Sequence, residues 1–214
     1  MLDFSFVNKY YMFFIVGVKN TVIIAAFSVL FGVVLGTMLA LLKQSRIKIF
    51  KVISSAYIEF MRGTPIMVQL FIIYYGLPIN LTAIPAGIVA LSLNSGAYVA
   101  EIIRAGIEAV DKGQMEAARS LGMNHTKAMK HIILPQAFKN ILPVLGNEFI
   151  TIIKESSIVS VIGVPELMYN AETIRGNTFK PFEPLIVAAL LYFVLTFSLS
   201  KLIGHTERRL KTSD

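Results

Sequence analysis

The sequence predicts an all-α integral membrane protein with five transmembrane helices in a single domain over residues 1–214. Apolar residues make up 55% of the chain and the mean hydropathy is +0.68, both above the usual values for a soluble protein. Apolar runs that are long enough to cross a bilayer, which takes about 20 helical residues, recur along the chain. One polar, helix-favouring segment interrupts these runs, and no linker, low-complexity tract or repeat divides the chain.

The five predicted spans are about residues 17–42, 53–75, 84–105, 141–164 and 185–204. The first run begins too late and is too long for a cleaved signal peptide. The aromatic residues before it form either a short helix on the outer surface or a flexible or simply packed segment. Gly32 and Gly36 have the small-xxx-small spacing that lets membrane helices approach closely, and we expect them to serve local packing.

The net charge of +7 lies in short loops and not on a face of a soluble domain, which argues against nucleic-acid binding. Lys and Arg concentrate in residues 43–51, between the third and fourth spans, and in the tail. The positive-inside rule therefore predicts that these segments are cytoplasmic, with the N-terminus outside and the C-terminus inside. The chain has no cysteine, and its three histidines lack metal-ligand spacing, so no metal site is expected.

Residues 114–135 form the polar segment between the third and fourth spans, and they are too polar to enter hydrocarbon. Because a glycine weakens a helix by about 1 kcal/mol, we expect Gly122 to separate two short helices. Ala117 and Ala118 leave little side-chain bulk, so a partner can approach the backbone closely. Pro135 and Pro143 each remove a backbone donor, and we expect them to break the fourth span off from this segment.

The polar segment has a specific spacing of small, acidic and apolar residues. Its elements are Glu116-Ala117-Ala118, then Gly122 after three residues, then Ile132, Leu134 and Pro135 after nine more. This spacing resembles the EAA signature of the membrane subunits of ABC importers, in which a short cytoplasmic coupling helix fits a groove on the ATPase. Residues 62–65, 97–106 and 154–163 are similar to the polar amino-acid branch, the histidine, arginine and glutamine permeases. The resemblance covers most of residues 59–168.

The resemblance implies the type I ABC importer permease fold and a role as the transmembrane subunit of an ATP-driven importer of polar amino acids. It implies a bacterial cytoplasmic membrane, a separate ABC ATPase, an extracytoplasmic solute-binding protein facing residues 166–177, and a second copy or a homologous permease subunit. The chain has no G-x-x-x-x-G-K-[ST] motif, so we expect a non-catalytic subunit that leaves ATP and Mg²⁺ to its partner and binds no cofactor. The residues expected to couple to the ATPase are Glu116, Ala117, Ala118, Arg119, Gly122, Leu134 and Pro135.

Ionisable residues inside the predicted spans are candidates for functional sites, because charge is costly in a bilayer. Arg62, Glu101 and Arg104 carry opposite charges at similar depth, and we favour a structural ion network over cargo contact for them. A zwitterionic cargo needs donors for its carboxylate and acceptors for its ammonium group. The candidate substrate-binding residues are Asn94, Ser95, Tyr98, Asn147, Glu148, Thr151, Lys154 and Ser157, with mutual packing of these polar groups as the alternative. If Glu148 or Glu155 lacks a basic partner, the cargo is basic, like arginine or lysine; glutamine is the alternative.

Two other functions are weighed against this interpretation. A stand-alone, ion-coupled amino-acid carrier would transport without ATP and would not need the EAA-like segment. An intramembrane enzyme would need a catalytic set at depth, yet no H-E-x-x-H, G-x-S-x-G or paired catalytic Asp is present.

Overall fold

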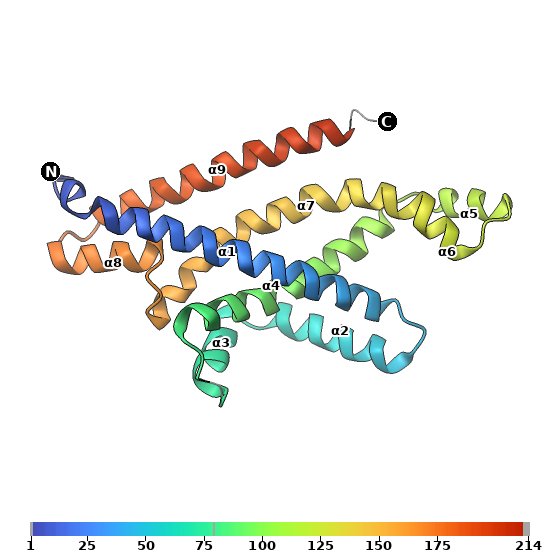
Figure 1. The fold of residues 1–214 in the computed structure, drawn as a ribbon, viewed down its shortest axis with the longest axis horizontal. Helices are drawn as coiled ribbons and strands as arrows, with labels where there is room; N and C mark the ends of the chain where they lie inside the picture. Colours follow the sequence, from blue (N-terminus) through green and yellow to red (C-terminus); the bar gives the residue numbers. More distant parts are fainter. Residues whose placement is uncertain (1, 79, 212–214) are drawn as a thin grey trace.

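The computed structural model describes residues 2–78 and 80–211, with side chains up to residue 208, and the regular elements in this part are helical. In chain order they are α1 (Val7–Lys43), α2 (Lys48–Gly63), α3 (Ile66–Phe71), the π-helical turn η1 (Ile72–Gly76), α4 (Ala83–Glu108), α5 (Lys112–Ser120), α6 (His125–Ala128), the π-helical turn η2 (Met129–Ile133), α7 (Leu134–Glu155), the 3₁₀ helix η3 (Ser156–Ile162), α8 (Leu167–Thr178) and α9 (Glu183–Lys211). Figure 1 shows α1, α7 and α9 running along the long axis of the molecule. The N-terminus and α8 lie at one end, and α5 and α6 lie at the other.

Three helices, α1, α4 and α9, are long and apolar enough to cross a membrane, and the bent pair formed by α2 and α3 with η1 makes a fourth if it is one span. The expected third and fifth spans fall within α4 and α9. The expected fourth span falls mostly in α7, which does not meet the same criterion. Its charged residues Glu148, Lys154 and Glu155 lower its hydropathy.

The N-terminal residues do not form a separate surface helix; of the alternatives, the packed segment is the one that the structure shows. Helix α1 begins at Val7 and continues without interruption to Lys43. Phe6 and Phe14 are buried against α8, which gives this part of the chain its own apolar core. Gly17 is required inside the helix, because a Cβ atom at this position would lie only 2.8 Å from the Leu167 Cα atom.

The second predicted span, residues 53–75, is not one straight helix. The chain bends by 108° between α2 and the pair of α3 and η1. Thr64 is extended, as a residue before proline prefers to be, and Pro65 follows it. The break frees the Met61 carbonyl oxygen, which accepts hydrogen bonds from the Gln69 Nε2 atom (2.8 Å) and the Asn94 Nδ2 atom (3.2 Å). A buried amide pair therefore satisfies the backbone that the bend exposes.

The expected break between the polar segment and the fourth span is absent. The helix is continuous from α6 through η2 into α7. Pro135 lies in this continuous helix near the start of α7, directly after the wider turn of η2, which accommodates its missing amide donor. Pro143 lies inside α7 without ending it.

The close packing expected at Gly32 and Gly36 is confirmed. A Cβ atom at Gly32 would lie 2.9 Å from the Ser95 Cβ atom, and one at Gly36 would lie 2.6 Å from the Val99 Cβ atom and 2.7 Å from the Gly96 carbonyl oxygen. The backbone of α1 therefore lies directly against α4, and only glycine fits at these positions.

Gly36→Val is expected to destabilise the protein by about 2–3 kcal/mol, because neither the Val99 side chain nor the Gly96 backbone can yield enough room. A lower apparent melting temperature of the detergent-solubilised protein would measure this loss. Gly204→Val in α9 is the matched control, since a Cβ atom there meets nothing within 4 Å. Equal melting temperatures for the two variants would contradict the close contact of α1 with α4.

Candidate functional site

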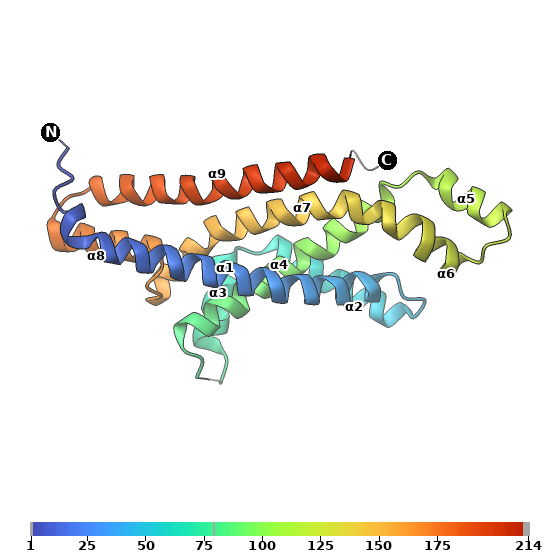
Figure 2. The ribbon, with the colours of Figure 1, turned by 45° about the horizontal axis from the view of Figure 1, so that its top comes forward.

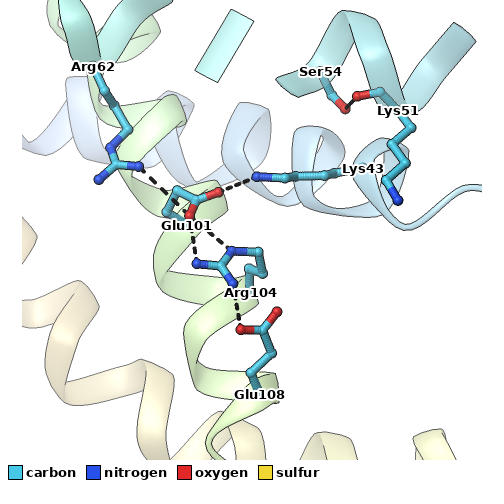
Figure 3. Close-up of polar contacts among 7 residues, drawn as sticks. All are labelled: Lys43, Lys51, Ser54, Arg62, Glu101, Arg104 and Glu108. Carbon is cyan, nitrogen blue, oxygen red and sulfur yellow. Dashed lines mark hydrogen bonds and ion pairs between the residues drawn. The ribbon is translucent and has the colours of Figure 1, made fainter. Parts of the chain in front are cut away.

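Five charged side chains from three helices form a cluster at the end of α4 that leads to α5 (Figure 3). We call Lys43, Arg62, Glu101, Arg104 and Glu108 the charge cluster. At its centre, Glu101 accepts a hydrogen bond from the Lys43 Nζ atom at 2.6 Å, and its other oxygen lies 2.9 Å from the Arg104 Nη2 atom. The Arg62 Nη1 atom lies farther away, at 3.8 Å from that oxygen. The cluster ties α1, α2 and α4 together.

The structure thus brings together the three residues predicted as an ion network and adds two that sequence reasoning missed. Glu108 follows Arg104 at i,i+4 spacing and pairs with it, a signal that was available in the sequence. No such signal was available for Lys43, because it lies 58 residues from Glu101 along the chain and the two meet only in the folded structure.

A cavity of about 680 Å³ adjoins the charge cluster, between α4, α7 and the end of α9. Its polar lining includes Arg62, Tyr98, Glu101, Arg104, Lys139 and Asn140. The Arg62 guanidinium lies over the Tyr98 ring, 5.5 Å from the ring centroid. The volume is within the range of small-molecule sites.

Of the eight candidate substrate residues, Tyr98 lines this cavity, and the others are placed by their own contacts and exposure. The Ser95 hydroxyl donates a 2.9 Å hydrogen bond to the Glu148 Oε1 atom, which links α4 to α7. Asn94 instead binds the Gln69 Oε1 atom at 3.0 Å and belongs to the bend of the second span. Asn147 and Lys154 are exposed and Thr151 is half-buried, while the Ser157 hydroxyl donates to the Lys154 carbonyl oxygen of its own helix turn.

Glu148 and Glu155 are half-buried, and within the described part of the chain neither forms an ion pair with a basic side chain. The Glu148 carboxylate has only the Ser95 hydroxyl as a hydrogen-bond donor there. A partly buried negative charge of this kind favours a cationic ligand.

The polar segment projects beyond the ends of the other helices (Figure 1 and Figure 2). Gly122 lies between α5 and α6 with φ of +85°, a conformation that favours glycine. The Met123 N–H donates to the Ala118 carbonyl oxygen at 3.1 Å and the Gly122 N–H to that of Arg119 at 3.0 Å, which closes α5 as a Schellman motif. The predicted break at Gly122 is therefore present, and it forms a compact knob.

The exposure of the segment decides which residues a partner can reach. Glu116, Ala117, Arg119, Gly122, Leu134 and Pro135 are exposed, whereas Ala118 is buried inside the protein. Sequence reasoning did not include Leu121 among the contact residues, yet 86% of it is exposed at the tip of the knob. This exposure depends on the turn at Gly122, which the apolar pattern of the sequence does not show.

The opposite end of the molecule is built on α8. Glu166, expected on the outer surface, is fully buried, so this part of the expectation is wrong. Its carboxylate caps α8 by accepting from the Met168 and Tyr169 N–H groups at 2.9 and 2.7 Å, and it also accepts from the Tyr192 hydroxyl at 2.7 Å. Burial raises the pKa of Glu166. The exposed part of α8 is formed by Tyr169, Arg175, Gly176 and Asn177.

Comparison with known proteins decides the family. Residues 32–212 match the model of binding-protein-dependent transport system inner membrane components. The chain belongs to this family. It is 46% identical to the arginine transport system permease protein ArtQ of Bacillus subtilis (strain 168), over 100% of this chain and 99% of that protein. It is 44% identical to a putative glutamine transport system permease protein GlnP of Rickettsia bellii (strain RML369-C), over 94% of each chain.

Solved structures agree with this assignment. A crystal structure of an amino acid ABC transporter with histidines superposes with a TM-score of 0.95 at 53% identity, covering 98% of this chain and 99% of that chain. The MetNI methionine ABC transporter in an inward-facing conformation superposes with a TM-score of 0.78 at 20% identity, covering 94% and 97%, and supports the fold alone. The protein is thus a permease subunit with the type I ABC importer fold, and ATP hydrolysis belongs to a partner subunit.

Proposed function

We propose that this permease imports a basic amino acid across a bacterial cytoplasmic membrane by alternating access. The observation that carries the proposal is Glu148, a half-buried carboxylate without a basic partner in the described part of the chain. The similar proteins named for arginine and histidines support a basic cargo, and those named for glutamine keep glutamine as the second candidate.

The proposed topology has five spans, with the N-terminus outside and the C-terminus inside. Helix α7 would be the fourth span, since it packs against α1, α4 and α9. The basic loop before α2, the α5–α6 knob and the C-terminal end of α9 lie toward one end of the molecule (Figure 1), as a common cytoplasmic side requires.

The partners follow from this topology. The knob formed by residues 112–128 would dock on a separate ABC ATPase, and the exposed part of α8 would face an extracytoplasmic binding protein. A second copy of the chain or a homologous permease would complete the pathway, because five spans are too few to enclose a pore by themselves. ATP and Mg²⁺ would bind to the ATPase.

The proposal is tested by reconstituting the permease with its ATPase and binding protein in liposomes and measuring ATP hydrolysis across a panel of amino acids. We expect arginine, lysine or histidine to stimulate hydrolysis and uptake. Stimulation by glutamine alone would show that the cargo is glutamine and not a basic amino acid. Uptake driven by an ion gradient without ATP would instead identify a stand-alone carrier.

A further inference from the structure

The guanidinium group of Arg62 lies at the edge of the cavity. The residue lies in the last turn of α2, its side chain is 44% exposed, and it lines the cavity of about 680 Å³. Its contact with Glu101 is 3.8 Å long, beyond hydrogen-bond distance. Within the described part of the chain Arg62 donates no hydrogen bond. Its planar donor fork is therefore available to a ligand.

The Arg62 guanidinium is not needed to neutralise Glu101 or to cap the carbonyl groups at the end of α2. Glu101 is already neutralised by closer contacts with Lys43 and Arg104, at 2.6 and 2.9 Å. The carbonyl groups at the end of α2 have other donors, since Thr64 binds the Phe60 oxygen at 2.8 Å and Gln69 binds the Met61 oxygen. Arg62 is thus neither the main partner of Glu101 nor the cap of its own helix.

The free fork has the geometry that recognises a carboxylate, because two parallel N–H donors match its two oxygens. Tyr98 holds the guanidinium from one side through the cation–π contact at 5.5 Å. Among the other cavity residues, Arg104 is occupied by Glu101 and Glu108. Arg62 is therefore the cation of the charge cluster that is best placed to receive an anionic group.

Residues one helical turn away connect the Arg62 site to the partly buried carboxylate of Glu148. Tyr98 follows Ser95 by one turn of α4, and Ser95 binds Glu148. The cavity reaches Val144, which precedes Glu148 by one turn of α7. One helical turn is about 5.4 Å, so Glu148 lies about one turn of α7 beyond the lining of the cavity.

We propose that Arg62 binds the α-carboxylate of the transported amino acid on the cytoplasmic side of the pathway, while the cationic side chain of that amino acid points toward Glu148. This inference rests on the proposed function, because it assigns the two ends of its cargo. The positions of Arg62 on α2 and Glu148 on α7 would then determine the orientation in which the cargo leaves.

Agmatine, which is arginine without its carboxylate, separates the two ends of the ligand. Binding of both compounds is measured by equilibrium dialysis to the permease–ATPase complex in detergent, without the binding protein. In Arg62→Gln we expect arginine to bind about 10- to 100-fold more weakly, the range for a lost charge-assisted hydrogen-bond pair, and agmatine to bind as before. Arg104→Gln is the matched control, and it should change the ratio of the two affinities much less.

Equal losses for arginine and agmatine in Arg62→Gln would overturn the proposal, as would an unchanged affinity for arginine. An equal change of the ratio in Arg104→Gln would assign the effect to the net charge of the cluster and would also overturn it. If the wild-type complex binds glutamine and not arginine, the proposed cargo is wrong, and glutamine with 4-aminobutyramide, its decarboxylated analogue, decides the role of Arg62 by the same comparison.

Discussion

Leu121→Asp is expected to abolish ATP-dependent uptake, with a loss of at least about 100-fold in the affinity of the permease for its ATPase. Leu121 is 86% exposed at the tip of the knob. Burying a leucine in a partner's cleft contributes about 1.5–3 kcal/mol, and an aspartate in the same place adds the cost of a desolvated, unpaired charge. Each 1.4 kcal/mol changes affinity about tenfold, so the two effects together account for the expected loss.

Co-purification of the ATPase with the tagged permease measures this effect directly, and uptake in liposomes measures its consequence. Leu121→Met is the matched control, because it keeps the apolar volume, and we expect it to retain the ATPase. Since Leu121 packs against little of its own chain, the melting temperature of the permease alone should not change. Normal recovery of the ATPase with Leu121→Asp would remove the knob from the proposed interface.

The sequence was sufficient to predict the features that depend on local composition. The extents of α4 and α9 follow from long apolar runs, and the break at Gly122 follows from the low helix propensity of glycine. The close approach at Gly36 follows from the small-xxx-small spacing, which describes one face of a single helix.

Features that depend on packing were missed or wrongly predicted. Thr64 and Pro65 contained a signal for the bend of the second span, but apolar residues on both sides concealed it, and the bend needs Gln69 and Asn94 to satisfy the backbone. Conversely, Pro135 was expected to break a helix that continues, because a π-helical turn before a proline cannot be seen in hydropathy.

In the candidate site, too, contacts that depend on tertiary packing were not predicted. Arg62, Glu101 and Arg104 were predicted as partners because they carry opposite charges at similar depth, whereas Lys43 enters from α1 through tertiary packing alone. Ser95 and Glu148 were both predicted as cargo residues, and the structure adds that they bind each other. The single Ser95 hydroxyl leaves most of the acceptor capacity of the Glu148 carboxylate open.

Glu148→Gln is expected to reduce the affinity for arginine by roughly 30-fold or more, since removing one partner of a desolvated charge pair costs about 2–5 kcal/mol. The substitution keeps the side-chain shape and an oxygen that can accept from Ser95, so the contact of α4 with α7 should survive. Uptake of labelled arginine and glutamine at several concentrations would separate the two cargo classes. Arginine uptake should fall, and glutamine uptake, where present, should persist.

Glu59→Gln is the matched control for this test, because Glu59 is exposed on α2 and belongs neither to the proposed cargo site nor to a proposed partner surface. It removes the same charge by the same substitution, and arginine uptake should be retained. Unchanged arginine uptake in Glu148→Gln would place Glu148 outside the cargo site, and its carboxylate would then serve only to join α4 to α7. A fall in both uptakes with a lowered melting temperature would lead to the same conclusion, because it would assign the loss to packing.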